Sequence, residues 1–483
     1  MNALSSGSIS RALLSACLLV VTGACTVGPD YHPPRSSLPT RFAESTESRA
    51  RPLPDDGAAW WTSFHDPVLN RLIDAALQSA PTIAQANARV REARAMVGIS
   101  GTALLPNASA DAAFKRNLGS QNLPVGVPPG GLGRGVHSNL FQAGFDASWE
   151  IDVFGGIRRG IESSDAGYEA AIEDRRDAIL TLAAEIARTY MDLRGMQEQL
   201  DVARRNLVIQ QDALAITTVQ LKAGLAPVLD PLRANAEVEG TQADIPVLQA
   251  DIRGAIYRIG ALVGRTPEDL LTQLEQPRPL PALDPDPPLG LPSDLLLRRP
   301  DVSAAERRIQ QENAKIGVAT ADYYPHFSLT GVTGIESLDA SKFLTGASLY
   351  YQVGPSMNWL IFDAGRTRFR IQAEQARTDR AQATYQQDVL NALRDVEAAM
   401  VTYAKAQIRY RHLKQEREQE ARALSVARRL YASGNENFLT VLDAQRTLYL
   451  VEDQLAKSDR DCATDLVALF KALGGGWQGT DRG

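Results

Sequence analysis

The side chains that most often carry catalysis or bind metals are sparse and scattered in this sequence. No two of its five histidines (His32, His65, His137, His326 and His412) stand at metal-ligand spacing on one helix. There is no Gly-x-Ser-x-Gly nucleophile elbow and no phosphate-binding loop. Carboxylate pairs are frequent, but they fall on heptad helices, where they form solvated faces. We therefore predict that the protein is not an enzyme and holds no metal or cofactor.

Two charged residues near the C-terminus could act without covalent chemistry. Asp443 and Arg446 are three residues apart, so in a helix they share one face and can pair locally or across chains. The alternative is a solvated pair that contributes about a few tenths of a kcal/mol.

A glycine-rich segment at residues 130–135 follows Pro128 and Pro129. Its glycines miss the spacing of a dinucleotide-binding fingerprint, and no helix follows that could bind a pyrophosphate. We interpret this segment as a flexible loop.

The overall composition excludes two further classes. Lysine and arginine total 51 against 57 acidic residues, for a net charge of -6, so no basic excess exists to bind nucleic acid. After the first 25 positions, no apolar run reaches the roughly 18 residues of a spanning helix. This excludes a helical membrane transporter.

The N-terminus predicts export. A polar start with one cation, Arg11, precedes an apolar stretch of 12 residues, which is too short to span a membrane. The pair Ala24-Cys25 resembles the processing site of bacterial lipoproteins, whose cysteine receives a diacylglycerol and whose new amine is acylated, for example by palmitate. We predict lipidation at Cys25. The alternative is an ordinary signal peptide with an incidental cysteine.

One unit occurs twice along the chain, because residues 81–106 match residues 300–325. Between the copies, residues 265–299 are rich in proline and predict an extended crossover. The predicted organisation is a signal peptide (1–24), a lipidated extended tether (25–59), a first repeat (60–264), the crossover (265–299), a second repeat (300–475) and a C-terminal tail (476–483).

Each copy predicts two strands. Apolar and polar residues alternate over residues 141–151, and the pattern returns 210 positions later over residues 351–361. Weaker alternation begins at Ala108 and at Phe327. A period of two predicts strands with one apolar and one polar face.

After the strands the apolar period changes to seven, which predicts long helices that pack as coiled coils. In the first copy the heptad position is held by Ile172, Ile179, Ile186, Leu193, Leu200, Leu207, Leu214 and Leu221. In the second copy it is held by Val389, Val396, Tyr403, Tyr410, Leu424 and Tyr431, and only Arg417 breaks it. A helix over residues 158–222 would be about 100 Å long. Gly224 and Gly434 end the long helices, and second helices follow over residues 228–263 and 438–473.

A strand of about 10 residues crosses a bilayer when tilted, so the four strands are candidates to span a membrane. Four strands alone would leave open edges with unsatisfied backbone groups in lipid. Several chains must therefore pool their strands: two chains would give 8 and three would give 12. This arithmetic leaves the number of chains open.

Several short motifs identify a family. They are Cys25 with Gly28-Pro29-Asp30-Tyr31, Trp60-Trp61 with Phe64-His65-Asp66-Pro67, residues 291–296 with Arg298-Arg299-Pro300-Asp301, and the strand-to-helix junctions at residues 149–155 and 362–366. Together they resemble the TolC-like outer-membrane efflux proteins, in particular the lipoprotein branch of NodT/RND-type outer membrane factors that serves tripartite drug pumps. The resemblance covers nearly the whole mature chain.

The resemblance implies an α+β membrane protein that forms a homotrimer. Its internally duplicated chains would share a 12-stranded β-barrel in the bacterial outer membrane, continuous with a tunnel of long coiled-coil helices in the periplasm. An inner-membrane RND-type pump and a periplasmic adaptor would open the inner end of the tunnel. The lipid partner would be the outer membrane itself.

The resemblance also implies where the working residues lie. Leu439, Asp443 and Arg446 match family positions that narrow the periplasmic entrance with an apolar ring and charge pairs. A ring of aspartates from several chains would also attract cations there and tune selectivity. Thr440 stands where some relatives carry a second aspartate. The two helical tips would contact the adaptor through Gly224, Leu229, Asp230 and Gly434.

The predicted function is the outer-membrane channel of a tripartite efflux pump, a component of multidrug resistance that conducts substrates passively. The alternative is a structural periplasmic coiled-coil lipoprotein tethered to the outer membrane. A spacer of that kind would have no use for two matching sets of amphipathic strands. Nor would it need Phe141, Phe145 and Trp149 on one strand face, whereas a lipid-facing band favours aromatic residues there.

Overall fold

The computed structural model describes residues 26–34, 38–43, 57–118, 122, 137–281 and 298–477. The predicted signal peptide, Cys25, the glycine-rich loop and residues 291–296 lie outside these ranges. The chain forms two compact units. The first, here the sheet unit, comprises residues 1–34, 91–170 and 306–384. The second, here the helix unit, comprises residues 35–90, 171–305 and 385–483.

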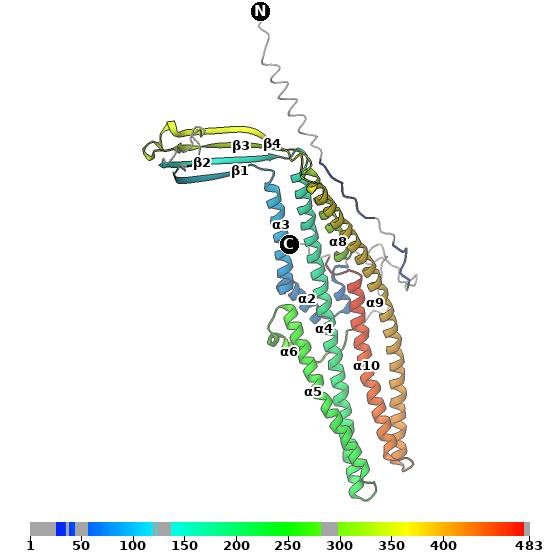
Figure 1. The fold of residues 1–483 in the computed structure, drawn as a ribbon. Helices are drawn as coiled ribbons and strands as arrows, with labels where there is room; N and C mark the ends of the chain where they lie inside the picture. Colours follow the sequence, from blue (N-terminus) through cyan, green and yellow to red (C-terminus); the bar gives the residue numbers. More distant parts are fainter. Residues whose placement is uncertain are drawn as a thin grey trace, which may run out of the picture. The chain divides into compact units, whose positions relative to one another are not determined.

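The duplication predicted from the sequence is visible in the lengths of the elements (Figure 1). The first copy runs α3 (Pro81–Thr102), β1 (Asn107–Leu118), β2 (His137–Ile151), α4 (Gly156–Lys222) and α5 (Leu229–Val263). The second runs α8 (Pro300–Ala321), β3 (His326–Ser337), β4 (Leu349–Asn358), α9 (Arg366–Ala432) and α10 (Phe438–Ala472). Matching helices have equal lengths of 22, 67 and 35 residues. The internal duplication is thus confirmed, while the domain boundaries given above stay a prediction.

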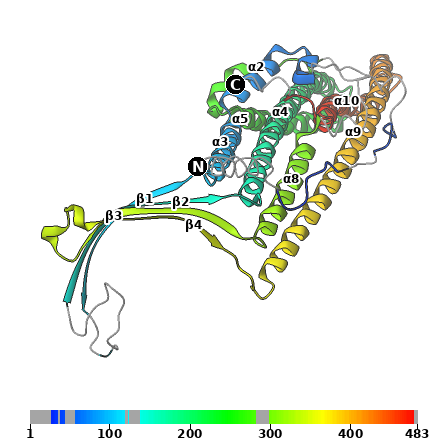
Figure 2. The ribbon, with the colours of Figure 1, turned by 90° about the horizontal axis from the view of Figure 1, so that it is seen from above.

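The sheet unit contains one antiparallel sheet with strand order β1-β2-β3-β4 (Figure 2). The two copies pair their strands in the same register. Asn107 lies opposite Ser148 in the first copy, and His326 lies opposite Asn358 in the second. These pairs differ by 219 positions on the first strand and 210 on the second. Pairing of β2 with β3 joins the two copies. The strands β1 and β4 form the two edges.

The register places the predicted apolar residues on one continuous face. Phe145 lies opposite Ala110 on one side and Thr333 on the other, and Thr333 lies opposite Tyr351. Directly opposed residues point to the same face of a sheet. Phe145 is 66% exposed and Tyr351 78% exposed. On the other face, the Ser109 hydroxyl donates to the Asp146 carboxylate over 2.8 Å. The prediction of one apolar and one polar face is confirmed.

The last strand is shorter than its alternation predicts. Strand β4 ends at Asn358, although the apolar–polar pattern continues to Ile361. Asn358 is opposite His326, the first residue of β3, so no partner extends further. The indole of Trp359 instead donates to the carbonyl oxygen of Tyr323 over 3.1 Å. The chain then turns into α9.

Each strand-to-helix junction is built from an aspartate and a glycine. The Asp152 carboxylate accepts hydrogen bonds from the main-chain N–H groups of Ile157 and Arg158 (3.2 and 2.9 Å) and so satisfies donors at the start of α4. Asp363 does the same at the start of α9 with Gly365 and Thr367 (2.8 and 2.7 Å). These contacts explain the two junction motifs noted in the sequence.

The helix unit buries the predicted heptad positions along the middle of both long helices. In α4 the buried members are Ile179, Ile186, Leu193 and Leu200, and in α9 they are Val389, Val396, Tyr403 and Leu424. Arg417, which breaks the heptad, forms an ion pair with Glu452 of α10 over 3.0 Å. None of the helices in the described ranges is both apolar and long enough to cross a membrane.

A short helix α2 (Pro67–Ser79) and a 3-10 helix η2 (Gly57–Phe64) cover one part of this core. Asp66 caps α2 by accepting from the N–H of Val68 at 2.7 Å, and it also accepts the Tyr190 hydroxyl at 2.5 Å. Burial and this hydrogen bond raise the pKa of Tyr190 to about 12. The crossover was expected to be extended, but its first part is helical: η3 (Pro267–Leu270) and α6 (Leu271–Leu274) pack beside α5.

Candidate functional site

Each long hairpin of the helix unit ends in a tight turn built on a left-handed glycine. Gly224 has φ 74° and donates to the carbonyl oxygen of Leu221 over 3.0 Å. Gly434 has the same φ and donates to Tyr431 over the same distance. Glycine adopts this conformation without a steric penalty, which explains why both predicted helix ends are correct. In the second turn, Asn437 caps α10 by accepting from the Thr440 N–H over 3.1 Å.

The three predicted gate residues lie together on the first turns of α10. Leu439 is 47% exposed, and Asp443 and Arg446 are also exposed. Among the residues that the structure describes, no hydrogen bond or ion pair joins the Asp443 carboxylate to the Arg446 guanidinium. Both charges are therefore presented outward from their own chain, and the local-pair alternative has no contact in its favour.

The opposite face of α10 is buried against the other helices. Phe438, Val441 and Gln445 line a cavity of about 430 Å³ together with side chains of α4 and α9. Gln445 is only 5% exposed, and its amide oxygen has no hydrogen-bond partner among the described residues. At the same place, the Tyr431 hydroxyl of α9 donates to the amide oxygen of Gln220 in α4. Burial raises the pKa of Tyr431.

The first hairpin presents an apolar tip. Leu225 is 80% exposed and Leu229 is 50% exposed, whereas Asp230 is half-buried in the first turn of α5. The main-chain N–H of Asp230 donates to the carbonyl of Pro227 over 3.2 Å. The structure thus brings the predicted residues Gly224, Leu229 and Asp230 into one turn. A contact with another protein at this turn stays a prediction.

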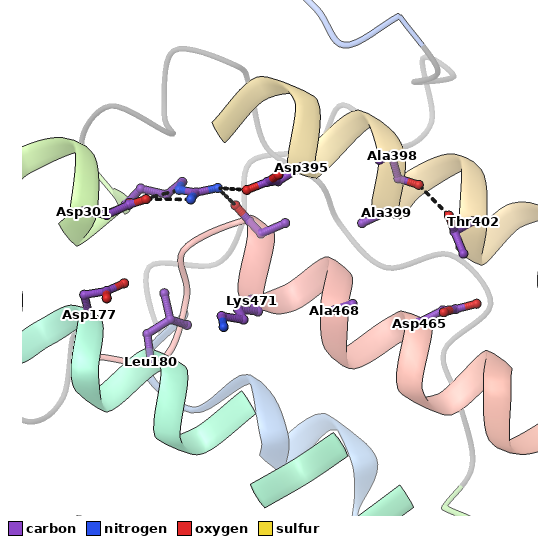
Figure 3. A pocket seen from close by; sticks show the side chains of 12 residues that line it. Asp177, Leu180, Asp301, Asp395, Ala398, Ala399, Thr402, Asp465, Ala468 and Lys471 are labelled. Atoms are coloured by element: carbon purple, nitrogen blue, oxygen red, sulfur yellow. Dashed lines mark hydrogen bonds and ion pairs between the residues drawn. The ribbon is translucent and has the colours of Figure 1, made fainter. Parts of the chain in front are cut away.

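A second cavity of the helix unit gathers charged side chains (Figure 3). Figure 3 shows Asp177 and Lys471 in the same cavity as Asp301 and Asp395. Arg299 pairs with Asp301 at 2.6 Å and with Asp395 at 3.5 Å. Its Nη1 also lies 3.5 Å from the carbonyl oxygen of Ala472, the last residue of α10.

The charges in this cavity have different surroundings. Arg299 forms ion pairs with Asp301 and Asp395, whereas burial is the main influence on the carboxyl group of Asp177. Burial, and next the nearby Asp301, raise the pKa of Asp177 above its ordinary value. Sequence reasoning recognised the motif that contains Arg299 and Asp301 but gave these residues no contact.

Two of the sequence motifs meet at the end of α10. Trp60 stacks on Phe470 with ring centroids 5.4 Å apart, and Trp61 and Phe64 are buried in the same core. The indole of Trp477 donates to the carbonyl of Arg298 over 2.8 Å. The motif tryptophans therefore have a packing role in the helix unit.

Across the described ranges, no three His, Cys, Asp or Glu side chains are arranged to hold a metal ion. The free thiol of Cys462 is buried, and burial raises its pKa to about 12, so the reactive thiolate is disfavoured there. The features with a possible function are thus the amphipathic sheet, the two helical tips and the α10 face.

Comparison with known proteins agrees with these features. The model of the outer membrane efflux protein family matches residues 72–265 and 291–475. The pyoverdine export outer membrane protein OpmQ of Pseudomonas putida is 32% identical over 96% of this chain and 97% of its own length.

Solved channels have the same fold. The outer-membrane channel OprN has a TM-score of 0.85 and 37% identity, covering 94% of this chain and all of its own. The MtrE channel of Neisseria gonorrhoeae, solved in an open state, has a TM-score of 0.77 and 28% identity over 94% of this chain and 99% of its own. The chain therefore belongs to the outer membrane efflux protein family and is an outer-membrane channel component of efflux systems.

Proposed function

We propose that the protein works as a homotrimeric, passive duct from the periplasm to the exterior, opened by a periplasmic adaptor and an inner-membrane RND-type transporter. The observation that carries this proposal is the four-stranded sheet, which has one continuous apolar face. Its exposed side chains include Phe145, Tyr351 and Val353, at 66%, 78% and 70%. An outward apolar band of this kind fits the lipid of the outer membrane, and the polar face fits a water-filled lumen. No covalent step is required.

The two edge strands support assembly from several copies. In the described part of the chain, β1 pairs only with β2, and β4 pairs only with β3. Open edges are not tolerated in lipid because their N–H and C=O groups would lack partners. Pairing β4 of one chain with β1 of the next satisfies both edges and closes the sheet. Three chains, the number implied by the family resemblance, give twelve strands.

The join between the two copies gives the register of this contact. Inside the chain, β2 of the first copy pairs with β3 of the second, and Ala143 lies opposite Ile335. Moving from β2 to β4 adds 210 positions, and moving from β3 to β1 subtracts 219. The equivalent pair between chains is Val353 with Arg116 of the next copy. This pair specifies which residues of neighbouring chains lie opposite each other in the proposed assembly.

Leu439, Asp443 and Arg446 are our proposed gate at the periplasmic end. They lie on the exposed face of α10, where copies of this face could meet around a central axis. In such a ring the aspartates attract cations and the leucines narrow the passage. The relative MtrE has been solved in an open state, which supports a family with more than one state of the passage.

The cavity behind the gate offers room for movement. Side chains of α4, α9 and α10 line it, and the hydrogen bond between Tyr431 and Gln220 joins α9 to α4 at the cavity wall. A close-packed interior resists displacement of a helix, whereas a cavity permits it at lower cost. We place the moving element in the α9–α10 hairpin.

The proposed adaptor contact comprises the tips at Gly224, Leu229, Asp230 and Gly434. The exposed leucines of the first tip support it, because exposed apolar groups mark sites of contact with other proteins. Acylation of Cys25, which lies outside the described residues, is proposed to anchor the chain in the outer membrane.

The first test is the mass of the detergent-extracted protein by light scattering, corrected for bound detergent, followed by conductance in planar bilayers. A trimer that conducts ions supports the duct. A monomer without conductance would contradict it and favour the alternative of a tethered coiled-coil spacer. The assembled sheet is what separates these two functions, because a spacer needs no closed edges.

A further inference from the structure

The described chain begins one residue after Cys25, and its first residues are fixed against the sheet unit. The N–H of Val27 donates to the carbonyl of Phe154 over 3.1 Å, directly after the end of β2. The carbonyl of Val27 accepts from Nε of Arg159 in α4 over 3.2 Å. Both main-chain groups of Val27 are therefore bonded to the β2–α4 junction.

Arg159 is the centre of these contacts. It is only 4% exposed, although it carries a charge. Its Nη2 pairs with Asp30 at 2.6 Å and its Nη1 pairs with Glu162 at 2.7 Å. One guanidinium thus holds two points of the N-terminal segment through a rigid planar fork of five donors, a geometry that the ammonium group of a lysine does not provide. The hydrogen bond from Arg159 lowers the pKa of Asp30, in agreement with this geometry.

Gly28 lets the segment approach the helices closely. Its φ is 92°, and a Cβ atom at this position would lie 2.4 Å from the Cα of Gly317 in α8. A Cβ atom at Gly317 would in turn lie 2.7 Å from Cγ of Arg159. The main chain of the N-terminal segment thus packs directly against the main chain of α8, and α8 packs directly against the side chain of Arg159. Neither contact leaves space for a methyl group.

The segment also bonds to the second copy. The amide nitrogen of Asn313 donates to the carbonyl of Pro29 over 3.0 Å, and the Tyr31 hydroxyl donates to Glu306 over 3.1 Å. Helix α4 belongs to the first copy and α8 to the second. Residues 27–31 therefore bridge both copies at the end of the sheet where the strands meet the helices.

We propose that residues 26–31 form a clasp, with Arg159 as its positioning residue, that fixes the acylated N-terminus at the β2–α4 junction. The proposal rests on the proposed acylation of Cys25. Thr26 adjoins Gly155, since a Cβ atom at Gly155 would lie 2.6 Å from Cγ2 of Thr26. The clasp thus holds the residue that follows the proposed acylation site beside the end of the strands.

The test is hydrogen exchange, followed by mass spectrometry, on the full mature protein in mild detergent. We expect slow exchange of the Val27 amide in the wild type and exchange faster by about tenfold or more in Arg159→Ala, because the open segment is no longer protected. Arg159→Lys is expected to fall between them, since it keeps the charge but loses the fork. Peptides from β2 report whether the sheet itself is intact.

Gly28→Ala disrupts the clasp by a steric clash and changes no charge. It is also expected to make the Val27 amide exchange faster. Arg307→Ala is the matched control, because Arg307 pairs with Glu169 in the sheet unit without a bond to residues 26–34. Equal protection of Val27 in the wild type, Arg159→Ala and Gly28→Ala would overturn the clasp.

Intact mass measures acylation separately. A wild type that lacks acyl groups but protects Val27 would remove the proposed lipid anchor and leave the contacts of the segment standing. An acylated wild type whose Val27 exchanges rapidly would overturn the clasp and leave the lipid anchor standing.

Discussion

Trp149 and Trp359 make the same hydrogen bond in the two copies of the repeat. The indole of Trp149 donates to the carbonyl of Leu104 over 2.9 Å, and the indole of Trp359 donates to the carbonyl of Tyr323 over 3.1 Å. The tryptophans are 210 positions apart and the acceptors 219, the offsets that relate the strand registers. The two copies are thus equivalent at single-residue level around the sheet, so a contact seen between them can predict a contact between chains.

The first prediction is the register of the strands between chains. The double variant Val353→Cys with Arg116→Cys is expected to form a disulfide between neighbouring chains under mild oxidation. Directly opposed residues lie about 4.5–5.5 Å apart between Cα atoms, within the range that a disulfide needs. Gel electrophoresis without reductant would show the linked chains. The bond cannot form within one chain as folded, because β2 and β3 separate β1 from β4.

Val353→Cys with Ala112→Cys is the matched control for this cross-link. Ala112 lies on the same face of β1 but four residues further along, or about 13 Å. If the control pair forms a disulfide more readily than the predicted pair, the pairing of β2 with β3 does not predict the pairing of β4 with β1 between chains. The natural Cys462 is buried and gives little background.

The second prediction concerns the gate. Replacement of Asp443 by Ala is expected to increase the conductance severalfold in a planar bilayer, because charge pairs between chains that narrow the entrance are lost. It is also expected to reduce the preference for cations, because a ring of negative charge is lost. Arg446→Ala is expected to increase conductance without that loss of preference. Asp453→Ala is the control, since Asp453 lies on the same helix and pairs with Lys457 at 2.7 Å. Variants with wild-type conductance and selectivity would remove both residues from the gate.

Much of this fold is predictable from the sequence because the duplication repeats each signal. The helix over residues 158–222 and its partner over 228–263 were predicted within two residues of the observed α4 and α5. Heptads fix the length of such helices and a left-handed glycine fixes their ends. Strand β4 was predicted too long, because alternation in the sequence carries no information about where the partner strand begins.

The contacts of single charged residues were not predictable in this way. Arg159 is 129 positions from Asp30 and 132 from Val27, and its sequence neighbours carry no sign of burial. The pair of Arg299 with Asp395, 96 positions away, is of the same kind. The cavity beside Gln445 also escapes a periodicity argument, because heptads report which residues face the core and say nothing of how well they fill it.

The third prediction is that Gln445→Leu stabilises the protein. Within the part of the chain that the structure describes, the amide oxygen of Gln445 is buried without a hydrogen-bond partner, which costs about 1–3 kcal/mol relative to a satisfied group. Leucine keeps a similar volume and removes that oxygen. We expect a higher midpoint of thermal unfolding, measured by circular dichroism in detergent. Gln387→Leu, at an exposed position of α9 where the amide bonds to Asn391, is the control and should give no gain.

The fourth prediction is a pH dependence that arises from Asp177. Burial raises the pKa of its carboxyl group in the folded state, so the folded chain holds a proton more tightly than the unfolded chain. Stability from this group is therefore fully present below the unfolded pKa and is lost as the pH rises through the folded pKa. Asp177→Asn keeps the neutral form at every pH. We expect its thermal midpoint to exceed that of the wild type at about pH 8 and to match it near pH 3, below the usual carboxyl range.

Asp395→Asn separates this effect from a general change of charge in the same cavity. Asp395 pairs with Arg299 at 3.5 Å, so its loss removes an attraction for a largely buried cation. We expect a lower midpoint at about pH 8, opposite in sign to Asp177→Asn. The same increase in both variants would mean that the cavity responds only to its total negative charge. In that case the burial of Asp177 would not be the cause of the higher midpoint. The raised pKa of Asp177 would then have no bearing on stability.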